Sequence, residues 1–304
     1  MLDQWASWPD QAGSGPFPAA YDMAPGGLEY VVYQPKDLAA ATKSRKLSIY
    51  IWGNGGCSQD GASARYHLTE IASHGYVAIA PGKIMSGPKA APAPAGAQGS
   101  GGMAEMMRNG ATSEKMIAAL DWILAENKRA GSPYFGLIDS EKVAIAGNSC
   151  GGLIAMKAAI DPRAKALDLE NSGVFGGVPA MPAGLPAMPA GAMANSPMMS
   201  MRKEDLAKFH TPVLYIEGGQ DDISQPNALD DFKRITQVPV FIADHPGAGH
   251  VGLFLDPNGE GTKVELDWLA WHLHGDRIAA ETFIGPNCEL CRDFRWVVYR
   301  KGIE

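Results

Sequence analysis

The chain has 304 residues, of which 46% are hydrophobic and 19% are charged, and its formal net charge is −7. This composition permits a large hydrophobic core, and α/β folds of this length often form a single domain. The negative charge, without a clustered basic patch, argues against a nucleic-acid partner. No apolar run is long enough to cross a bilayer.

The order of the predicted elements indicates an α/β fold. Residues 1–26 show no hydrophobic periodicity, and we expect them to form an irregular N-terminal arm on the surface. Runs rich in β-branched and aromatic residues then predict strands. They fall at residues 27–34, 46–52, 76–80, 142–147, within 165–175, and at 212–217 and 238–243. Apolar residues at helical spacing predict helices. These fall at residues 64–74, from 113 to just before 131, and at 152–160 and 262–272. Strands that alternate with helices predict a mostly parallel central sheet with helices on both faces.

Two long segments interrupt this pattern. Residues 86–110 are rich in Pro, Ala and Gly, and residues 176–201 contain a near-repeat of Pro-Ala-Met-Pro-Ala-Gly. We expect both to be flexible loops. The methionines of the second segment suit either an adaptable apolar wall or a solvent-exposed loop. The sequence thus predicts one domain over residues 27–275, followed by a C-terminal tail at 276–304.

The C-terminal tail contains a Cys-x-x-Cys pair, Cys288 and Cys291. No second cysteine pair or histidine pair stands beside it, so a zinc site would lack half of its ligands. A redox role would need a thioredoxin-like context, which the pattern does not provide. We therefore expect a local disulfide that pins the tail. Disulfides favour a secreted or periplasmic protein, although residues 1–5 lack the regions of a signal peptide. A cytoplasmic location stays open.

The strongest functional signal lies at Gly147-Asn148-Ser149-Cys150-Gly151. An apolar β-prone run ends there and a helical run begins at once, which is the strand–turn–helix context of a G-x-S-x-G nucleophile elbow. Glycines two residues on either side of Ser149 let the strand and helix approach closely around a strained serine. The hydroxyl group would lie at the positive end of the helix. The alternative is an ordinary turn between a strand and a helix.

Candidates for the acid and the base of a catalytic triad follow later in the chain. A strand runs into a turn that carries Asp221 and Asp222. We favour Asp221, the first residue clear of the glycine turn, and keep Asp222 as the second choice. His250 lies between glycines after the last strand and is our candidate base, with His245 as the second choice. The order Ser, Asp, His along the chain agrees with that of α/β-hydrolases.

Two backbone N–H groups would be needed to stabilise an oxyanion at Ser149. One should belong to Cys150, the residue after the nucleophile, and the other to the Gly53-Asn54-Gly55-Gly56 loop that follows an apolar strand. Our choice in that loop is Asn54, with Gly55 next. The glycines there also fit a simple tight turn.

The elbow, the Trp-Gly-Asn-Gly-Gly loop, the late Asp and the final His together resemble the α/β-hydrolase superfamily. Within it, residues 27–275 look most like the dienelactone-hydrolase, cutinase and polyester-hydrolase branch. The resemblance implies a serine esterase that acts through an acyl-enzyme on aryl, short-acyl or polyester substrates, without metal or cofactor. The chain departs from polyester hydrolases at Asn148, where they often have His, and at Cys150, where they often have Met. Dienelactone hydrolases use a cysteine nucleophile, so Ser149 favours ester hydrolysis instead.

The remaining cysteines lie beside the expected oxyanion donors. If both donors converge on one oxygen, Cys57 and Cys150 are brought close together, and we predict a disulfide between them. The alternative is a pair of small buried apolar residues. A peptidase or an acyltransferase with the same triad, or a binding protein without activity on this fold, also stays open. We expect a monomer.

Overall fold

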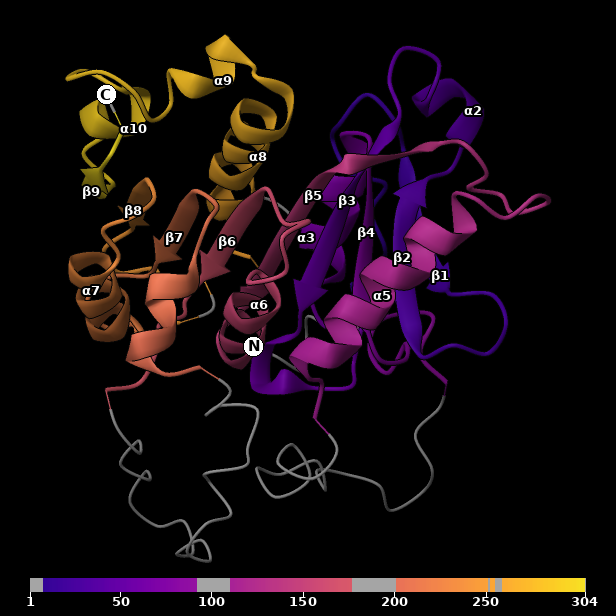
Figure 1. The fold of residues 1–304 in the computed structure, drawn as a ribbon, viewed down its shortest axis with the longest axis horizontal. Coiled ribbons are helices and arrows are strands. Elements are labelled where there is room, and N and C mark those ends of the chain that lie inside the picture. The colour runs from indigo at the N-terminus through magenta and orange to yellow at the C-terminus, as the bar shows by residue number, and fades with distance from the viewer. Residues whose placement is uncertain (1–7, 92–109, 177–200, 251, 255–258, 304) are drawn as a thin grey trace, which may run out of the picture.

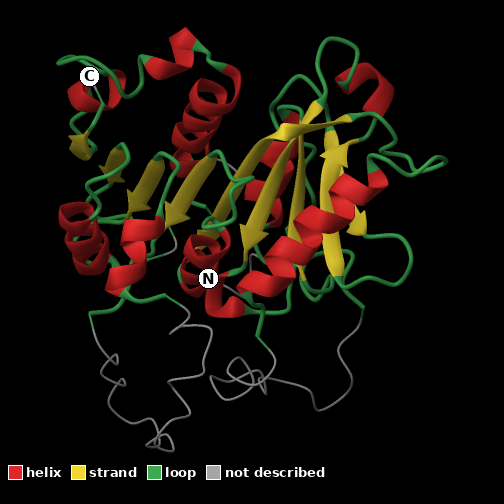
Figure 2. Ribbon diagram, viewed as in Figure 1, coloured by secondary structure: helices red, strands yellow, loops and turns green. Residues whose placement is uncertain are grey.

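The computed structural model describes residues 8–91, 110–176, 201–250, 252–254 and 259–303. These form one nine-stranded sheet in the order β1-β2-β4-β3-β5-β6-β7-β8-β9 (Figures 1 and 2). The strands are β1 (Ala19–Met23), β2 (Tyr30–Pro35), β3 (Leu47–Gly53), β4 (Tyr76–Pro81), β5 (Ile138–Asn148), β6 (Ala166–Glu170), β7 (Val213–Glu217), β8 (Val240–Asp244) and β9 (Val297–Lys301). The two flanks of the molecule are therefore joined by one continuous sheet.

The centre of the sheet is parallel and its edges are antiparallel. Neighbouring strands run parallel from β4 across to β8. At the edges, β2 pairs antiparallel with β4, β1 with β2, and β9 with β8. Every residue of β3, β4, β6, β7 and β8 is buried, as expected for strands covered on both faces. The predicted α/β class with a mostly parallel sheet is confirmed.

Helices cover both faces of this sheet. The helical segments are α2 (Leu38–Ala41), η1 (Gly55–Cys57), α3 (Arg65–Ser73), α5 (Ser113–Glu126), α6 (Cys150–Ala158), η3 (Lys203–Lys208), α7 (Gln225–Arg234), α8 (Glu260–His274), α9 (Arg277–Ala280) and α10 (Glu289–Arg292). Helices α5, α6 and α7 pack on one face, and α3 and α8 pack on the other (Figure 1). The hydrophobic core is accordingly split into two clusters, one on each face.

The expected boundaries of the domain were too narrow. The N-terminal arm is not irregular throughout, because residues 19–23 form β1, and the C-terminal tail supplies β9, so both segments belong to the sheet. Edge strands bury few residues, so their sequences show only a weak hydrophobic pattern. In β1 just Ala19 and Tyr21 are buried, and in β9 no residue is. The predicted Cys288–Cys291 disulfide is present and lies at the start of α10. Most of the two predicted loops, 86–110 and 176–201, lies outside the described residues.

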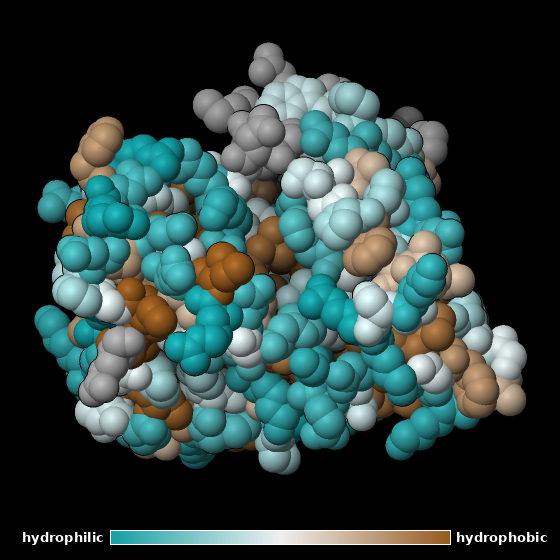
Figure 3. Space-filling view, turned by 90° about the horizontal axis from the view of Figure 1, so that it is seen from above, coloured by the Kyte–Doolittle hydropathy of each residue, from teal (hydrophilic) through white to brown (hydrophobic). Residues whose placement is uncertain are grey.

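The parallel strands end at the edge of the sheet from which α6 starts, and Figure 3 looks onto the opposite end of the molecule. The surface there is mostly hydrophilic, with separate hydrophobic patches, and is hollowed near its middle. Within the described residues, no helix combines the length and the hydrophobicity needed to span a bilayer.

Candidate active site

Ser149 occupies a sharp turn between β5 and α6. Its φ of 54° and ψ of −122° are unusual for a residue other than glycine, and such a conformation costs about 1–3 kcal/mol. The turn is held by two backbone hydrogen bonds: the Ser149 N–H donates to the Glu170 carbonyl at 2.8 Å, and the Gly152 N–H donates to the Ser149 carbonyl at 2.9 Å. The Ser149 side chain makes no capping bond to α6 and is half-buried. Its hydroxyl is therefore left for other partners.

Glycines make this turn sterically possible. A Cβ atom on Gly151 would lie 2.0 Å from the carbonyl oxygen of Gly53, and one on Gly147 would lie 2.5 Å from the carbonyl oxygen of Gly151. Both neighbours are backbone atoms, which cannot move aside as a flexible side chain can. The ends of β3 and β5 and the start of α6 thus approach more closely than any side chain allows.

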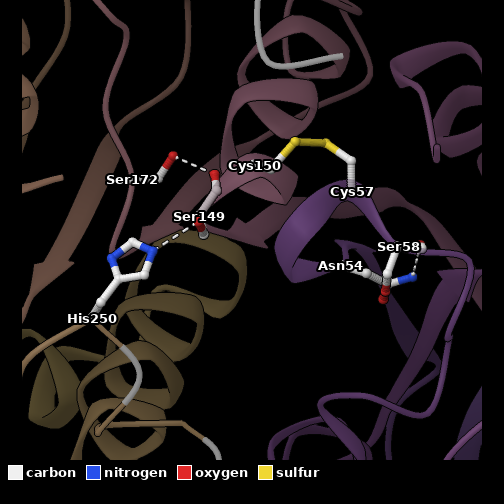
Figure 4. The surroundings of a disulfide bond; sticks show 7 residues. All are labelled: Asn54, Cys57, Ser58, Ser149, Cys150, Ser172 and His250. Atoms are coloured by element: carbon white, nitrogen blue, oxygen red, sulfur yellow. Dashed lines mark hydrogen bonds between the residues drawn. A yellow bond between two sulfur atoms is a disulfide. The ribbon is translucent and has the colours of Figure 1, made fainter. Parts of the chain in front are cut away.

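A hydroxyl, an imidazole and a carboxylate form one hydrogen-bonded chain at this turn. The Nε2 atom of His250 lies 2.9 Å from the Ser149 Oγ atom (Figure 4). The Nδ1 atom of the same ring lies 2.7 Å from Oδ1 of Asp222. The serine follows β5, the carboxylate follows β7 and the imidazole follows β8, so three parallel strands carry these groups to one edge of the sheet. The His250 side chain is 26% exposed, so the pair it makes with Ser149 is within reach of solvent.

The structure corrects the choice of carboxylate. Asp221 is exposed, whereas Asp222 is 1% exposed and contacts His250. Gly219 has a φ of +84°, and its carbonyl oxygen accepts the Asp222 N–H at 2.9 Å. Asp221 is thus not clear of the glycine turn, as the sequence suggested, but lies inside it, so that the second aspartate is directed inward and the first faces solvent.

Asp222 is surrounded by hydrogen-bond donors. Its Oδ1 atom accepts bonds from His250 and from the Ser224 N–H and hydroxyl, while Oδ2 accepts bonds from the Asn171 side chain at 2.5 Å and from the Gly218 N–H at 3.1 Å. Burial raises the pKa of this carboxyl, but the hydrogen bonds from His250, Asn171 and Ser224 outweigh burial and bring the pKa well below its usual range. Asp222 is therefore ionised at neutral pH.

Asn171 was missed at the level of sequence. It follows β6 with a φ of 46°, a left-handed conformation that Asn adopts more readily than most residues. Its side-chain amide contacts both Asp222 and the Gly249 carbonyl, at 3.3 Å for the latter. The only signal in the sequence is a polar residue directly after a buried strand. The residue ties the carboxylate to the loop that carries His250.

His245, the second candidate base, lies apart from the serine. Its ring stacks edge-on against Trp296 with the centroids 4.9 Å apart, and its Nε2 atom lies 3.8 Å from a carboxylate oxygen of Glu260. Its position directly after β8 directs it toward the C-terminal segment. The histidine that meets Ser149 is thus His250, as the sequence predicted.

The predicted disulfide between Cys57 and Cys150 is present and joins η1 to the first residue of α6 (Figure 4). In the loop that precedes η1, the Asn54 side chain donates to the carbonyl oxygens of Ser58, at 3.0 Å, and Pro81, at 2.7 Å. A Cβ atom on Gly55 would lie 2.7 Å from the side-chain oxygen of Asn148. The loop is therefore fixed against the elbow both covalently and by packing, with the Asn54 side chain engaged elsewhere.

A scan of the sequence against models of known protein families finds no match, and a search of curated proteins finds no significant relative.

Proposed function

We propose that this protein is a serine carboxylic-ester hydrolase of the α/β-hydrolase type. Ser149 is the nucleophile, His250 the general base and then acid, and Asp222 the residue that orients His250. The single observation that carries the proposal is the hydrogen-bonded chain of 2.9 Å and 2.7 Å through these three side chains. The strand–turn–helix context of the serine and the chain order of the three residues support the fold type.

The first half of the reaction follows from the protonation states. Asp222 accepts the Nδ1–H of His250, which leaves the lone pair of Nε2 directed at Ser149. As Oγ bonds to the carbonyl carbon of the ester, its proton passes to Nε2. The tetrahedral intermediate then collapses, the bond to the alcohol oxygen breaks, and His250 returns the proton to the departing alcohol. An acyl group remains on Ser149.

Water completes the cycle by the same steps. His250 removes a proton from a water molecule as its oxygen attacks the acyl carbon, and then protonates Oγ as the acid departs. In both halves the negative oxygen needs preorganised donors, and we assign them to the backbone N–H groups of Cys150 and Asn54. One such donor is typically worth about 10²–10³ in kcat. The Cys57–Cys150 disulfide supports this assignment, since it links the two segments that carry the donors.

The decisive experiment compares the protein with its Ser149→Ala variant on p-nitrophenyl esters of short acids. We expect the variant to lose several orders of magnitude in kcat, to keep its circular-dichroism spectrum, and to lose labelling by a fluorophosphonate probe. Turnover preserved in the variant would contradict the proposal. A protein that is folded but neither labelled nor active would instead be a binding protein on this fold.

The class of substrate is the next question for this site. A peptidase or an acyltransferase would use the same three residues, and product analysis with amides and with added alcohols separates them from an esterase. A panel of short acyl esters, feruloyl and acetyl-sugar esters and a polyester film then tests the acyl and alcohol preference. The two disulfides support a secreted or periplasmic location.

A further inference from the structure

A second group of polar side chains is buried on the face of the sheet that α3 and α8 cover. It consists of His67 on α3, Glu170 on β6 and Glu265 on α8, with Tyr50 of β3 beside them. His67 is 1% exposed and the other three are fully buried. One ligating atom from each of the three acidic or imidazole side chains can be chosen so that all lie within 4.8 Å of one another. The apolar core surrounds this group, and the mechanism proposed above does not use it.

The carboxylates of this group are only partly paired. Within the part of the chain that the structure describes, neither carboxylate oxygen of Glu170 and neither of Asp168, two residues earlier on the same strand, has a hydrogen-bond partner. In Glu265, Oε1 accepts the Tyr50 hydroxyl at 2.6 Å and Oε2 is unpaired. No Lys or Arg among the described residues forms an ion pair with these acids. Burying a charge without a partner is costly, and buried acids normally either pair with a cation or coordinate a metal.

The distances within the group suit a small divalent cation. Nε2 of His67 lies 3.4 Å from Oε1 of Glu170 and 3.3 Å from Oε2 of Glu265. A tetrahedral zinc site with bonds of about 2.0–2.1 Å has ligand–ligand separations of about 3.3–3.4 Å, from the geometry of a tetrahedron. The two distances from Nε2 of His67 to the glutamate oxygens therefore match the distance between two ligand atoms of a tetrahedral zinc site.

The orientation of the imidazole agrees with this geometry. Nδ1 of His67 lies 2.9 Å from the hydroxyl oxygen of Thr262. Nε2 lies 3.0 Å from the hydroxyl oxygen of Tyr50, whose O–H donates to Oε1 of Glu265 at 2.6 Å. If Nδ1–H donates to Thr262, Nε2 keeps a lone pair on the side where Tyr50 and the two glutamates lie. Histidines that ligate metals typically donate their other ring N–H in this way.

We propose that His67, Glu170 and Glu265 bind a structural divalent cation, for which Zn²⁺ is the best fit. Two ionised glutamates would balance its charge, and the imidazole would supply the nitrogen ligand that Zn²⁺ accepts readily. The site would brace the nucleophile turn from below, because the Glu170 carbonyl accepts the Ser149 N–H. A hollow of about 500 Å³ between the N-terminal arm, α3 and α8 is lined in part by His67 and Thr262 and offers a route to the site.

Metal content tests this proposal without reference to esterase activity. The full chain, expressed without a polyhistidine tag and dialysed against metal-free buffer, should retain about one Zn²⁺ per molecule by mass spectrometry of the metal. A strong chelator should lower the thermal midpoint, and added Zn²⁺ should restore it. Protein that contains no stoichiometric metal, and whose midpoint responds to neither treatment, would overturn the proposal. Protons on the carboxyls would then neutralise the group.

Variants provide the specificity control. Glu170→Gln and His67→Gln should each lower zinc occupancy at least about tenfold, since each removes one of three protein ligands. The matched control is Glu70→Gln, because Glu70 also lies on α3 and lines the same hollow but bonds to Ser14 and His74 instead. Its zinc content should equal that of the wild type. Zinc that survives Glu170→Gln or is lost in Glu70→Gln would refute the assignment of ligands.

Discussion

Replacing Asp222 by Asn tests the proposed triad at the residue where sequence and structure disagree. The change preserves size and removes charge, and the surroundings of the carboxylate determine its effect. Donors approach both carboxylate oxygens: His250 and Ser224 at Oδ1, and Asn171 and Gly218 at Oδ2. The NH₂ group of an asparagine must replace one of these oxygens, so at least two donors lose their acceptor in either orientation.

Each of the two orientations of the asparagine amide disrupts a different part of the hydrogen-bond network. With NH₂ at the Oδ1 position, His250 must turn Nδ1 into an acceptor, and its proton moves to Nε2, where it blocks proton transfer from Ser149. With NH₂ at the Oδ2 position, it meets the Asn171 amide and the Gly218 N–H at hydrogen-bond distance. Unsatisfied buried groups cost about 1–3 kcal/mol each, and enforcing the wrong tautomer in a comparable triad lowers kcat about 10⁴-fold.

We therefore expect Asp222→Asn to lower kcat by about 10³–10⁴-fold on p-nitrophenyl esters, with a modest loss of thermal stability. The matched control is Asp221→Asn, one residue away in an exposed position, which should change kcat by no more than about twofold because exposed substitutions are usually mild. Near-normal turnover in Asp222→Asn, together with a large loss in Asp221→Asn, would refute the assignment of the acid.

Three further predictions concern the support of the site and the pH dependence of stability. Replacing Cys57 and Cys150 together by Ser should lower the free energy of unfolding by roughly 2–5 kcal/mol, measured by denaturant unfolding, because the bond closes a long loop with a sequence separation of 93; an unchanged midpoint would contradict this. Asn171→Ala should lower kcat about tenfold or more, since a hydrogen bond to a charged group is worth about 1.5–3 kcal/mol, whereas unchanged kcat would show that Asp222 is held without it. Burial lowers the pKa of His272 from 6.5 to about 4, so between these values the unfolded chain binds a proton that the folded protein does not, and stability should fall as pH falls through this window. Thermal melts at pH 7 and pH 5 should therefore show a smaller drop for His272→Gln than for the wild type, and equal drops would argue against the burial effect.

The juxtaposition of Ser149 and His250 could be predicted because local pattern and topology agree there. The serine lies where an apolar run changes into a helical one, and His250 follows the last parallel strand, whose end lies at the same edge of the sheet. The choice between two adjacent aspartates depended on the backbone conformation of Gly219. The residues around Gly219 in the sequence do not predict that conformation. Asn171 depends in the same way on a left-handed residue that has no pattern of its own.

The buried acids show how tertiary packing overrides a local pattern. In β6, Asp168 and Glu170 alternate with leucines, which is the pattern of a strand with one face in solvent. Helix α8 is distant in the chain but packs on that face, so both acids are fully buried. The contact between β6 and α8 joins residues almost a hundred positions apart, and a single sequence gives no indication of it. The edge strands β1 and β9 were missed because small or half-exposed segments leave little periodicity.

The bond that ties η1 to the start of α6 also bears on how this protein would have to be produced and assayed. A chain made in a reducing cytosol would carry two thiols at that position, and the proposed esterase activity would then be measured on a sample without the bond between the two loops. Turnover per milligram would then depend on the fraction of molecules with an intact disulfide as much as on purity. Titration of thiols should therefore precede any comparison of variants prepared in different hosts.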